Sequence, residues 1–237
     1  MSEYYDVILL AAGSATRFNH QSDRNKVLMP LKDRPVFDYS LSMFLSDPKC
    51  RNILFVTRET ERPLFEEKTK DIYKEMPSKI IWVTGGKERQ DSVSCALSDI
   101  RGDKSPAILV HDAARPFITR DLICRLLAGL SESPAVIPGI MAKDSMKLVK
   151  AAVVDQSLQR SAVRHIQTPQ VFRTECLLEA VTRAEEEQFY GNEEGELVER
   201  LGYQVSVVEG LEQNLKITTA MDYTFARFMV EQQQVDR

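Results

Sequence analysis

Arg17 and Lys26 are the first residues of the chain whose types and spacing suit a chemical role. They follow a continuous apolar run, residues 7–10, and a group of very small residues, 11–13. Small residues let main-chain amides approach a bound group closely, while an arginine offers a fork of donors and a lysine a point charge. The pattern predicts a buried β-strand that opens into a polyphosphate-binding loop. An ordinary polar loop after a strand explains this segment alone equally well.

Two familiar phosphate-binding motifs do not fit this stretch. In a Walker loop a glycine precedes the lysine, but Lys26 follows Asn25, and Val27 stands where a Ser or Thr is needed. A dinucleotide fingerprint needs three glycines, of which only Gly13 is present. The expected loop is therefore of another kind.

A second candidate loop contains Gly85 and Gly86, followed by Arg89 and Ser92. Paired glycines allow a sharp turn with exposed amides. Arg89 and Ser92 fall near the start of the next expected helix, whose positive end favours anions or polar ligand groups. A simple tight turn is the alternative interpretation.

Asp112 and Arg115 follow an expected strand, residues 107–110. A carboxylate at the carboxyl end of a strand can hold Mg²⁺ while a nearby arginine contacts phosphate. The alternative is a buried ion pair between Asp112 and Arg115 that only fixes the turn. His111, beside them, is expected to be a hydrogen-bonded core or turn residue without a catalytic role.

Ser145, Arg160 and Thr168 supply hydroxyls and a guanidinium that can bind a phosphorylated second substrate, and Lys216 adds a cation before the last expected helix. Each of these can instead be a solvated surface group. The whole set has separated cations, one carboxylate suited to a metal and no pattern for a Ser or Cys nucleophile. It predicts nucleotidyl transfer by in-line displacement, in which the substrate itself supplies the attacking oxygen.

The elements that must position these residues alternate between strands and helices. Strands are expected at residues 6–10, 52–57, 79–83, 107–110, 135–141 and 204–208, and helices at 36–45, 59–75, 90–100, 121–130, 175–189 and 220–231. This order predicts an α/β fold, a Rossmann-like three-layer sandwich with a mostly parallel central sheet and ligands beyond the carboxyl ends of its strands. No linker rich in Gly, Ser or Pro divides the chain, so we expect one domain over residues 1–237.

Residues 143–164 interrupt this alternation. Two short apolar stretches surround a small-residue turn, which predicts an inserted β-hairpin arm. A hairpin of this kind is poorly stable alone and should pack against something, such as a second subunit. A hairpin folded back on its own sheet is the alternative.

Composition limits the class of protein. The net charge of −4 and pI near 5.6 argue against a nucleic-acid-binding face. The 4 cysteines form no CxxC pair, which makes zinc an unexpected ligand. No signal peptide or long apolar run is present in the 237 residues, so we expect a cytoplasmic protein without membrane contact.

Six motifs spread over the whole chain resemble those of the 2-C-methyl-D-erythritol 4-phosphate cytidylyltransferase family of the non-mevalonate isoprenoid pathway. They are Leu10-Ala-Ala-Gly13 with Arg17 and Arg24-Asn-Lys26, Gly85-Gly86 with Glu88-Arg-Gln-Asp-Ser92, Val110-His-Asp-Ala-Ala-Arg-Pro116, Asp144-Ser-Met-Lys147, Gln167-Thr-Pro-Gln170 and Asn214-Leu-Lys216. The resemblance implies transfer of CMP from CTP to methylerythritol phosphate with release of pyrophosphate, with Mg²⁺, in a cytoplasmic homodimer joined through the arm.

The resemblance also implies roles for individual residues. It implies that the cytidine contacts Ala11, Ala12, Gly13, Gly85, Gly86, Arg89 and Ser92. The reacting phosphates are expected to contact Arg17, Lys26 and Lys216, and Mg²⁺ to bind Asp112. The acceptor is expected to contact Arg115, Ser145, Arg160 and Thr168. Ser145, Arg160 and Thr168 are expected to come from the arm of the partner. Because the nucleophile is an ionised phosphate, no general base is required.

Some positions depart from the family pattern or bear on rival functions. Ser145 stands where the family commonly has Thr and retains the hydroxyl, while residues 191–197 lack the expected acidic pattern and receive no role.

A pentitol-phosphate cytidylyltransferase acting on ribitol 5-phosphate is the closest rival function, and Ala12 and Ala114 favour methylerythritol phosphate over it. A non-catalytic nucleotide-binding protein would be expected to lack Arg17, Lys26, Asp112 or Lys216, all of which this chain has.

Overall fold

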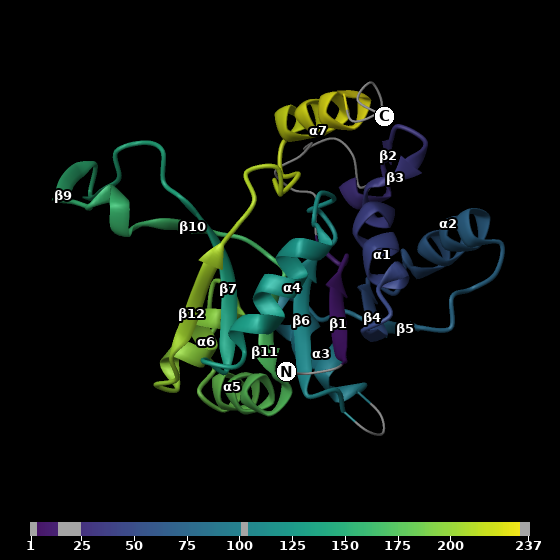
Figure 1. Ribbon diagram of the computed structural model, residues 1–237, viewed down its shortest axis with the longest axis horizontal. Helices are drawn as coiled ribbons and strands as arrows, with labels where there is room; N and C mark the ends of the chain where they lie inside the picture. The colour runs from purple at the N-terminus through teal and green to yellow at the C-terminus, as the bar shows by residue number, and fades with distance from the viewer. Residues whose placement is uncertain (1–3, 14–24, 101–103, 233–237) are drawn as a thin grey trace.

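A computed structural model describes residues 4–13, 25–100 and 104–232. Its centre is an eight-stranded sheet in the order β10-β7-β11-β6-β1-β4-β5, with β12 paired to β7 (Figure 1). The strands are β1 (Tyr5–Leu10), β4 (Cys50–Thr57), β5 (Ile80–Thr84), β6 (Ala107–Asp112), β7 (Ala135–Met141), β10 (Arg164–Ile166), β11 (Gln170–Arg173) and β12 (Val205–Glu209). Because β5, β4, β1 and β6 pair in parallel, as do β7 and β12, the expected α/β fold with a mostly parallel sheet is confirmed.

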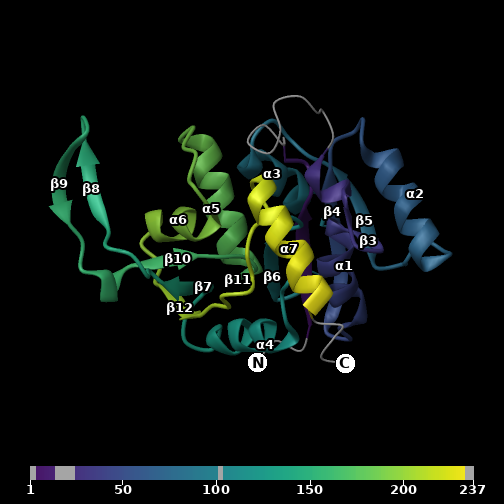
Figure 2. The ribbon, with the colours of Figure 1, turned by 90° about the horizontal axis from the view of Figure 1, so that it is seen from above.

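Helices cover both faces of the sheet (Figures 1 and 2). They are α1 (Val36–Ser46), α2 (Arg62–Tyr73), α3 (Arg89–Ser98), α4 (Arg120–Gly129), α5 (Thr174–Glu186), α6 (Glu194–Arg200) and α7 (Ala220–Gln232). One apolar core packs β1 against α1, α4 and α7. A second core, on the other face of the sheet, packs β1 against α3, α5 and α6. None of the helices among the described residues is long and apolar enough to cross a membrane.

Strand β1 lies inside the sheet, between β6 and β4, and has apolar side chains buried on both faces. Val7 and Leu9 pack in one core and Ile8 in the other, all at 0% exposure. Leu10 is in register with Val56 of β4 and Asp112 of β6. The carboxyl ends of these three strands therefore meet at one edge of the sheet, where the predicted loops begin.

Strand β11 was not expected from the sequence. It runs antiparallel between β6 and β7, and the short β10 is antiparallel to β7. After β7 the chain leaves the carboxyl edge of the sheet as the arm and returns to the same edge, so the strands that follow must run in the opposite direction. This antiparallel insertion places residues 167–169 beside the end of β6.

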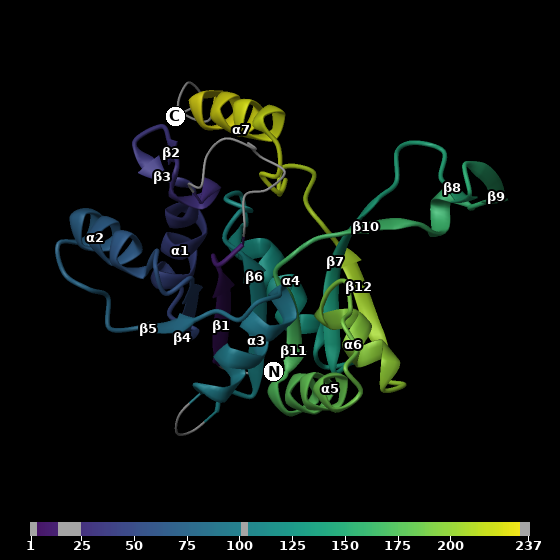
Figure 3. The ribbon, with the colours of Figure 1, turned by 180° about the vertical axis from the view of Figure 1, so that it is seen from behind.

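The arm is a separate hairpin of β8 (Lys147–Lys150) and β9 (Val153–Ser157) that projects from the sheet (Figures 1 and 3). Its two turn residues, Ala151 and Ala152, have φ angles of 48° and 64°. Left-handed geometry at both positions is that of a type I′ hairpin turn, whose twist matches the flanking strands. Every residue of both strands is exposed, so the alternative of a hairpin folded back on its own sheet is wrong.

Three small elements complete the described chain. They are the 3-10 helices η1 (Lys26–Leu28) and η2 (Arg160–Ala162) and the hairpin of β2 (Pro30–Leu31) and β3 (Arg34–Pro35). The helix expected at residues 59–75 is shorter, because the chain first turns at residues 59–61 and α2 begins at Arg62 with a proline in its first turn. The short helix α6 was not expected.

Candidate active site

A cleft of about 660 Å³ opens at the carboxyl ends of the parallel strands. Its lining combines the first loop, which follows β1, the glycine loop, which contains Gly85 and Gly86, and the end of β6. The lining residues include Ala11, Ala12, Gly13, Lys26, Gly86, Arg89, Ser92, Asp112 and Lys216. Residues from segments more than 200 positions apart in the sequence thus share one cleft, as expected for a fold of this class. Arg17 lies outside the described residues.

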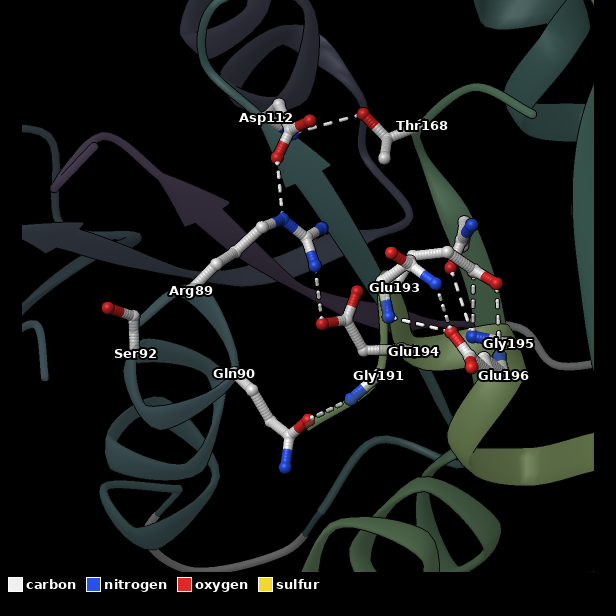
Figure 4. A network of polar contacts seen from close by, with 12 residues as sticks. Arg89, Gln90, Ser92, Asp112, Thr168, Gly191, Glu193, Glu194, Gly195 and Glu196 are labelled. Atoms are coloured by element: carbon white, nitrogen blue, oxygen red, sulfur yellow. Dashed lines mark hydrogen bonds and ion pairs between the residues drawn. The ribbon is translucent and has the colours of Figure 1, made fainter. Parts of the chain in front are cut away.

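Asp112 lines this cleft and belongs to a network of charged side chains (Figure 4). Its Oδ1 accepts a hydrogen bond from Arg89 Nε at 3.1 Å, and its Oδ2 accepts one from Lys216 Nζ at 2.7 Å. Arg115 is not one of its ion-pair partners: Arg115 Nη1 donates to the main-chain oxygen of Asn214 at 2.8 Å. The alternative of an Asp112–Arg115 ion pair that fixes the turn is therefore wrong.

Electrostatics keep the cluster charged. Burial alone would raise the pKa of Asp112, but the positive charges of Arg89 and Lys216 outweigh it and hold that pKa well below its usual range. Burial would likewise lower the pKa of Arg89, yet the carboxylates of Glu194 and Asp112 raise it. Asp112 is thus an anion, and Arg89 a cation, throughout the physiological pH range.

The segment before α7 brings Lys216 to Asp112. Ile217 N donates to the main-chain oxygen of Ala114 at 2.9 Å, and Asn214 Nδ2 donates to the main-chain oxygen of Thr168 at 2.8 Å. These bonds fix the segment over the end of β6 on either side of the lysine. The sequence identified the lysine but not this attachment.

Gly85 and Gly86 are required for close packing. A Cβ on Gly85 would lie 2.8 Å from Ala12 Cβ and 2.9 Å from Ser92 Oγ, and one on Gly86 would lie 2.4 Å from Asp91 Cβ. Real side chains do not tolerate contacts this short, so only glycine lets the loop approach both the first loop and α3. Helix α3 then begins at Arg89, which confirms that Arg89 and Ser92 lie at its start.

Lys26 is placed by its neighbour Asn25. The Asn25 amide is buried and donates to the main-chain oxygen of Ala11 at 2.7 Å and to Glu61 Oε2 at 2.9 Å. These bonds tie η1, which starts at Lys26, to the end of β1. Lys26 therefore lines the same cleft as Asp112 and Lys216.

Thr168 and His111 form a buried network behind Asp112. Thr168 Oγ1 accepts from Asp112 N at 3.1 Å and lies 3.1 Å from His111 Nδ1, while His111 Nε2 lies 3.1 Å from the main-chain oxygen of Arg115. Burial lowers the pKa of His111 to about 4. A neutral ring satisfies both contacts if Nε2–H donates to Arg115 and Nδ1 accepts from the threonine hydroxyl. His111 is thus the hydrogen-bonded core residue that was expected.

The predicted acceptor-binding residues do not all lie together. Thr168 lies between β10 and β11, beside Asp112 of its own chain, so its expected place on the arm is wrong. Ser145 and Arg160 do lie on the arm, exposed and outside the cleft, where Arg160 Nη1 donates to the main-chain oxygen of Lys143 at 3.1 Å.

Glu194 is a residue of this site that sequence reasoning missed. It is 1% exposed at the start of α6, and its Oε1 lies 2.6 Å from Arg89 Nη1. Burial raises its pKa, and the charge of Arg89 opposes that shift. The only signal in the sequence is an acidic residue before the apolar pair 197–198, which is too short a pattern to identify the helix.

The residues around Asp112 fit a magnesium ion that arrives with a nucleotide. Among the described residues no group of three His, Cys, Asp or Glu side chains could hold a metal. Mg²⁺ is commonly bound by one or two carboxylates together with substrate phosphates and water, rather than by a cage of side chains. Each carboxylate oxygen can accept more than one contact, so Asp112 can hold a metal beside its two cations.

Comparison with known proteins places the whole chain in one family. The family model described as "IspD: 2-C-methyl-D-erythritol 4-phosphate cytidylyltransferase" matches residues 5–232. A Lysinibacillus sphaericus protein of that name is 38% identical over 221 residues, covering 93% of each chain. One from Bacillus thuringiensis is 36% identical over 230 residues, covering 97% of this chain and 99% of the relative.

Solved structures agree with this result. The crystal structure of a 4-diphosphocytidyl-2C-methyl-D-erythritol synthase from Anaerococcus prevotii superposes with a TM-score of 0.83 at 26% identity, over 97% of this chain and 96% of that chain. The Francisella tularensis 2-C-methyl-D-erythritol 4-phosphate cytidylyltransferase gives a TM-score of 0.79 at 28% identity, over 95% and 99%.

Proposed function

Since the chain belongs to the 2-C-methyl-D-erythritol 4-phosphate cytidylyltransferase family, it is a CTP-dependent nucleotidyltransferase of isoprenoid precursor biosynthesis, and we propose that the cleft around Asp112 is its active site. The observation that supports this assignment is the row of charges at the end of β6, where Arg89 and Lys216 lie 3.1 Å and 2.7 Å from the Asp112 carboxylate. A fixed set of charges of this kind stabilises charge that develops on phosphates.

In the proposed mechanism a phosphate oxygen of methylerythritol phosphate attacks the α-phosphorus of CTP, and pyrophosphate leaves. Lys26 and Lys216, together with Arg17, stabilise the negative charge of the transition state. No general base is needed, because the attacking phosphate is already ionised. This agrees with the buried and neutral His111, which makes its two contacts inside the protein.

The nucleotide would lie along the first loop and the glycine loop. Ala11, Ala12 and Gly13 leave space and main-chain groups for the base and ribose, and Gly85 and Gly86 bring the start of α3 and Ser92 close to them. Asp112 would hold Mg²⁺, which when bound supplies positive charge to the phosphates of CTP. Arg89 lines the same cleft and would contact the cytidine while two carboxylates hold its guanidinium.

The arm is proposed to join two copies of this chain into a homodimer. Leu148, Val149, Val153 and Val154 are 46–68% exposed on it, and a soluble chain rarely leaves such a patch uncovered. Ser145 and Arg160 on this arm would then complete the acceptor site of the partner, while Thr168 and Arg115 act in their own chain. Residues 1–237 would form one domain in a cytoplasmic enzyme.

The test is pyrophosphate release with CTP, Mg²⁺ and methylerythritol phosphate, run beside ribitol 5-phosphate and the other nucleoside triphosphates. We expect release only with CTP and methylerythritol phosphate. Release only with ribitol 5-phosphate would leave the chemistry intact and change the acceptor. Absence of release with every acceptor would contradict the proposed activity.

A further inference from the structure

Glu194 is a buried acid that reaches the candidate active site only through Arg89. It is 1% exposed and does not line the cleft, whereas Arg89 does. Its Oε1 accepts from Arg89 Nη1, but its buried Oε2 has no hydrogen-bond partner among the described residues. Burying a carboxylate with half of its acceptor capacity unused destabilises a fold, and an apolar contact between α6 and α3 would avoid that penalty. A role in the charged cluster explains why an acid lies here.

Arg89 is held from two sides. Its Nε donates to Asp112 Oδ1 at 3.1 Å and its Nη1 to Glu194 Oε1 at 2.6 Å, so the two donors point to carboxylates on different elements. Figure 4 shows the guanidinium between these carboxylates. A long side chain held at one donor can still rotate, but one held at two donors of a planar fork has a single orientation.

Charges alternate along the cluster from Glu194 through Arg89 and Asp112 to Lys216. Each neighbouring pair has opposite charges. The distance is 2.6 Å between Glu194 and Arg89, 3.1 Å between Arg89 and Asp112, and 2.7 Å between Asp112 and Lys216. Without Glu194 the guanidinium would be held at one donor only and would carry a charge with no second partner. It could then turn away from Asp112 toward the phosphates of a bound nucleotide.

We propose that Glu194 is a positioning residue that holds Arg89 against Asp112 Oδ1, so that Asp112 keeps the orientation in which Oδ2 meets Lys216. This inference rests on the proposed function, because it names a further residue of the same site. Glu194 contacts no substrate in this arrangement and acts on the rate of transfer through the orientation of the cluster. Groups that orient a catalytic side chain in this way typically contribute about 10- to 100-fold to activity.

The test is the Glu194→Gln variant, which keeps the shape of the side chain and removes its charge. We expect kcat with CTP and methylerythritol phosphate to fall about 10- to 100-fold while KM for methylerythritol phosphate changes less than about threefold. Glu199→Gln is the matched control, since Glu199 is an exposed acid on the same helix, and its kcat should equal that of the wild type. Wild-type kcat in Glu194→Gln would overturn the inference.

A double-mutant cycle separates this role from a structural one. In an Arg89→Ala background, the added Glu194→Gln change should alter kcat by less than about twofold, because the residue through which Glu194 acts is gone. An equal loss in both backgrounds would show that Glu194 does not act through Arg89.

A second variant keeps the inference testable if Glu194→Gln does not fold, as judged by the fluorescence of the single tryptophan, Trp82. Arg89→Lys keeps the charge but has no fork to reach both carboxylates, and should lose kcat by about the same 10- to 100-fold factor. Wild-type kcat in Arg89→Lys would overturn the inference. A wild-type protein that releases no pyrophosphate would instead contradict the proposed function, so the two failures are distinguishable.

Discussion

Mild acid should destabilise the fold through His111. The imidazole is 0% exposed, and burial lowers its pKa from 6.5 to about 4. Between these two values the unfolded chain binds a proton that the folded chain does not bind. The contribution of His111 to stability is therefore fully present above pH 6.5 and is lost as the pH falls toward 4.

The size of this effect follows from the interval between the two pKa values. One pKa unit corresponds to about 1.36 kcal/mol, so the neutral ring contributes about 3 kcal/mol to the unfolding free energy over the whole interval. About 2 kcal/mol of this is lost between pH 7 and pH 5. A change of that size is easily measured against the 5–15 kcal/mol of an ordinary domain.

The assay is urea unfolding at pH 7 and pH 5, followed by Trp82 fluorescence, for the wild type and His111→Gln. The glutamine amide can donate to the main-chain oxygen of Arg115 as the ring does, but it does not titrate. Other titrating groups are shared by both proteins and cancel in the difference. We expect the wild type to lose about 2 kcal/mol more than the variant. Losses that agree within about 0.5 kcal/mol would refute the assignment of a buried neutral His111.

Three further predictions follow from the site and the arm. Asp112→Asn should lower the unfolding free energy by about 2–3 kcal/mol at pH 7. This value lies between those of exposed and buried ion pairs, because the two cationic partners of Asp112 are partly exposed. Urea unfolding measures the loss, and a loss below about 1 kcal/mol would contradict the prediction. Gly85→Ala should lower the unfolding free energy by about 1–3 kcal/mol, since the added Cβ would lie 2.8 Å from Ala12 Cβ. An unchanged Tm in calorimetry would disprove this. Val149→Lys combined with Val153→Lys should give a monomer in light scattering at concentrations where the wild type is dimeric, and a dimer that survives both changes would show that the arm is not the interface.

The sequence was sufficient for the part of the site that belongs to parallel strands. The strand ending at Leu10 contains the apolar run 7–10, and the strand ending at Asp112 contains the apolar run 107–110, a pattern typical of strands buried on both faces. Parallel strands bring their carboxyl ends to one edge, so the small residues after Leu10 and the carboxylate of Asp112 could be expected to meet. The register of Leu10 with Asp112 confirms this.

The partners of these residues could not be predicted, because they are distant in the sequence. Glu194 is 105 positions from Arg89, and it lies in a seven-residue helix that is too short to show a period. Asn214, which accepts from Arg115, is 99 positions away from it. The proximity of Asp112 and Arg115 in the sequence suggested an ion pair, whereas the fold provides other partners for both.

Strand β11 was missed for a different reason. Residues 170–173 are only four, and their letters carry no alternation that would distinguish a strand from a turn. Their direction depends on the arm, which returns the chain to the edge of the sheet that it left. A local pattern contains no information about such a return.

The position of β11 also affects the order in which the protein can form during synthesis. Strands β1, β4, β5 and β6 pair with one another and are complete once residue 112 has been made. Within the described part of the chain, the partners of β7 are β10, β11 and β12, all of which follow it in the sequence. At about 5–20 residues per second, the apolar β7 waits roughly 2–6 seconds on the ribosome before residue 173 is added. We expect chains stopped before residue 170 to aggregate through this strand, and a truncated chain that stays fully in the soluble fraction would contradict that expectation. The insertion that places Thr168 beside Asp112 thus also leaves the apolar β7 without a complete set of partner strands until residue 173, and then β12, have been made.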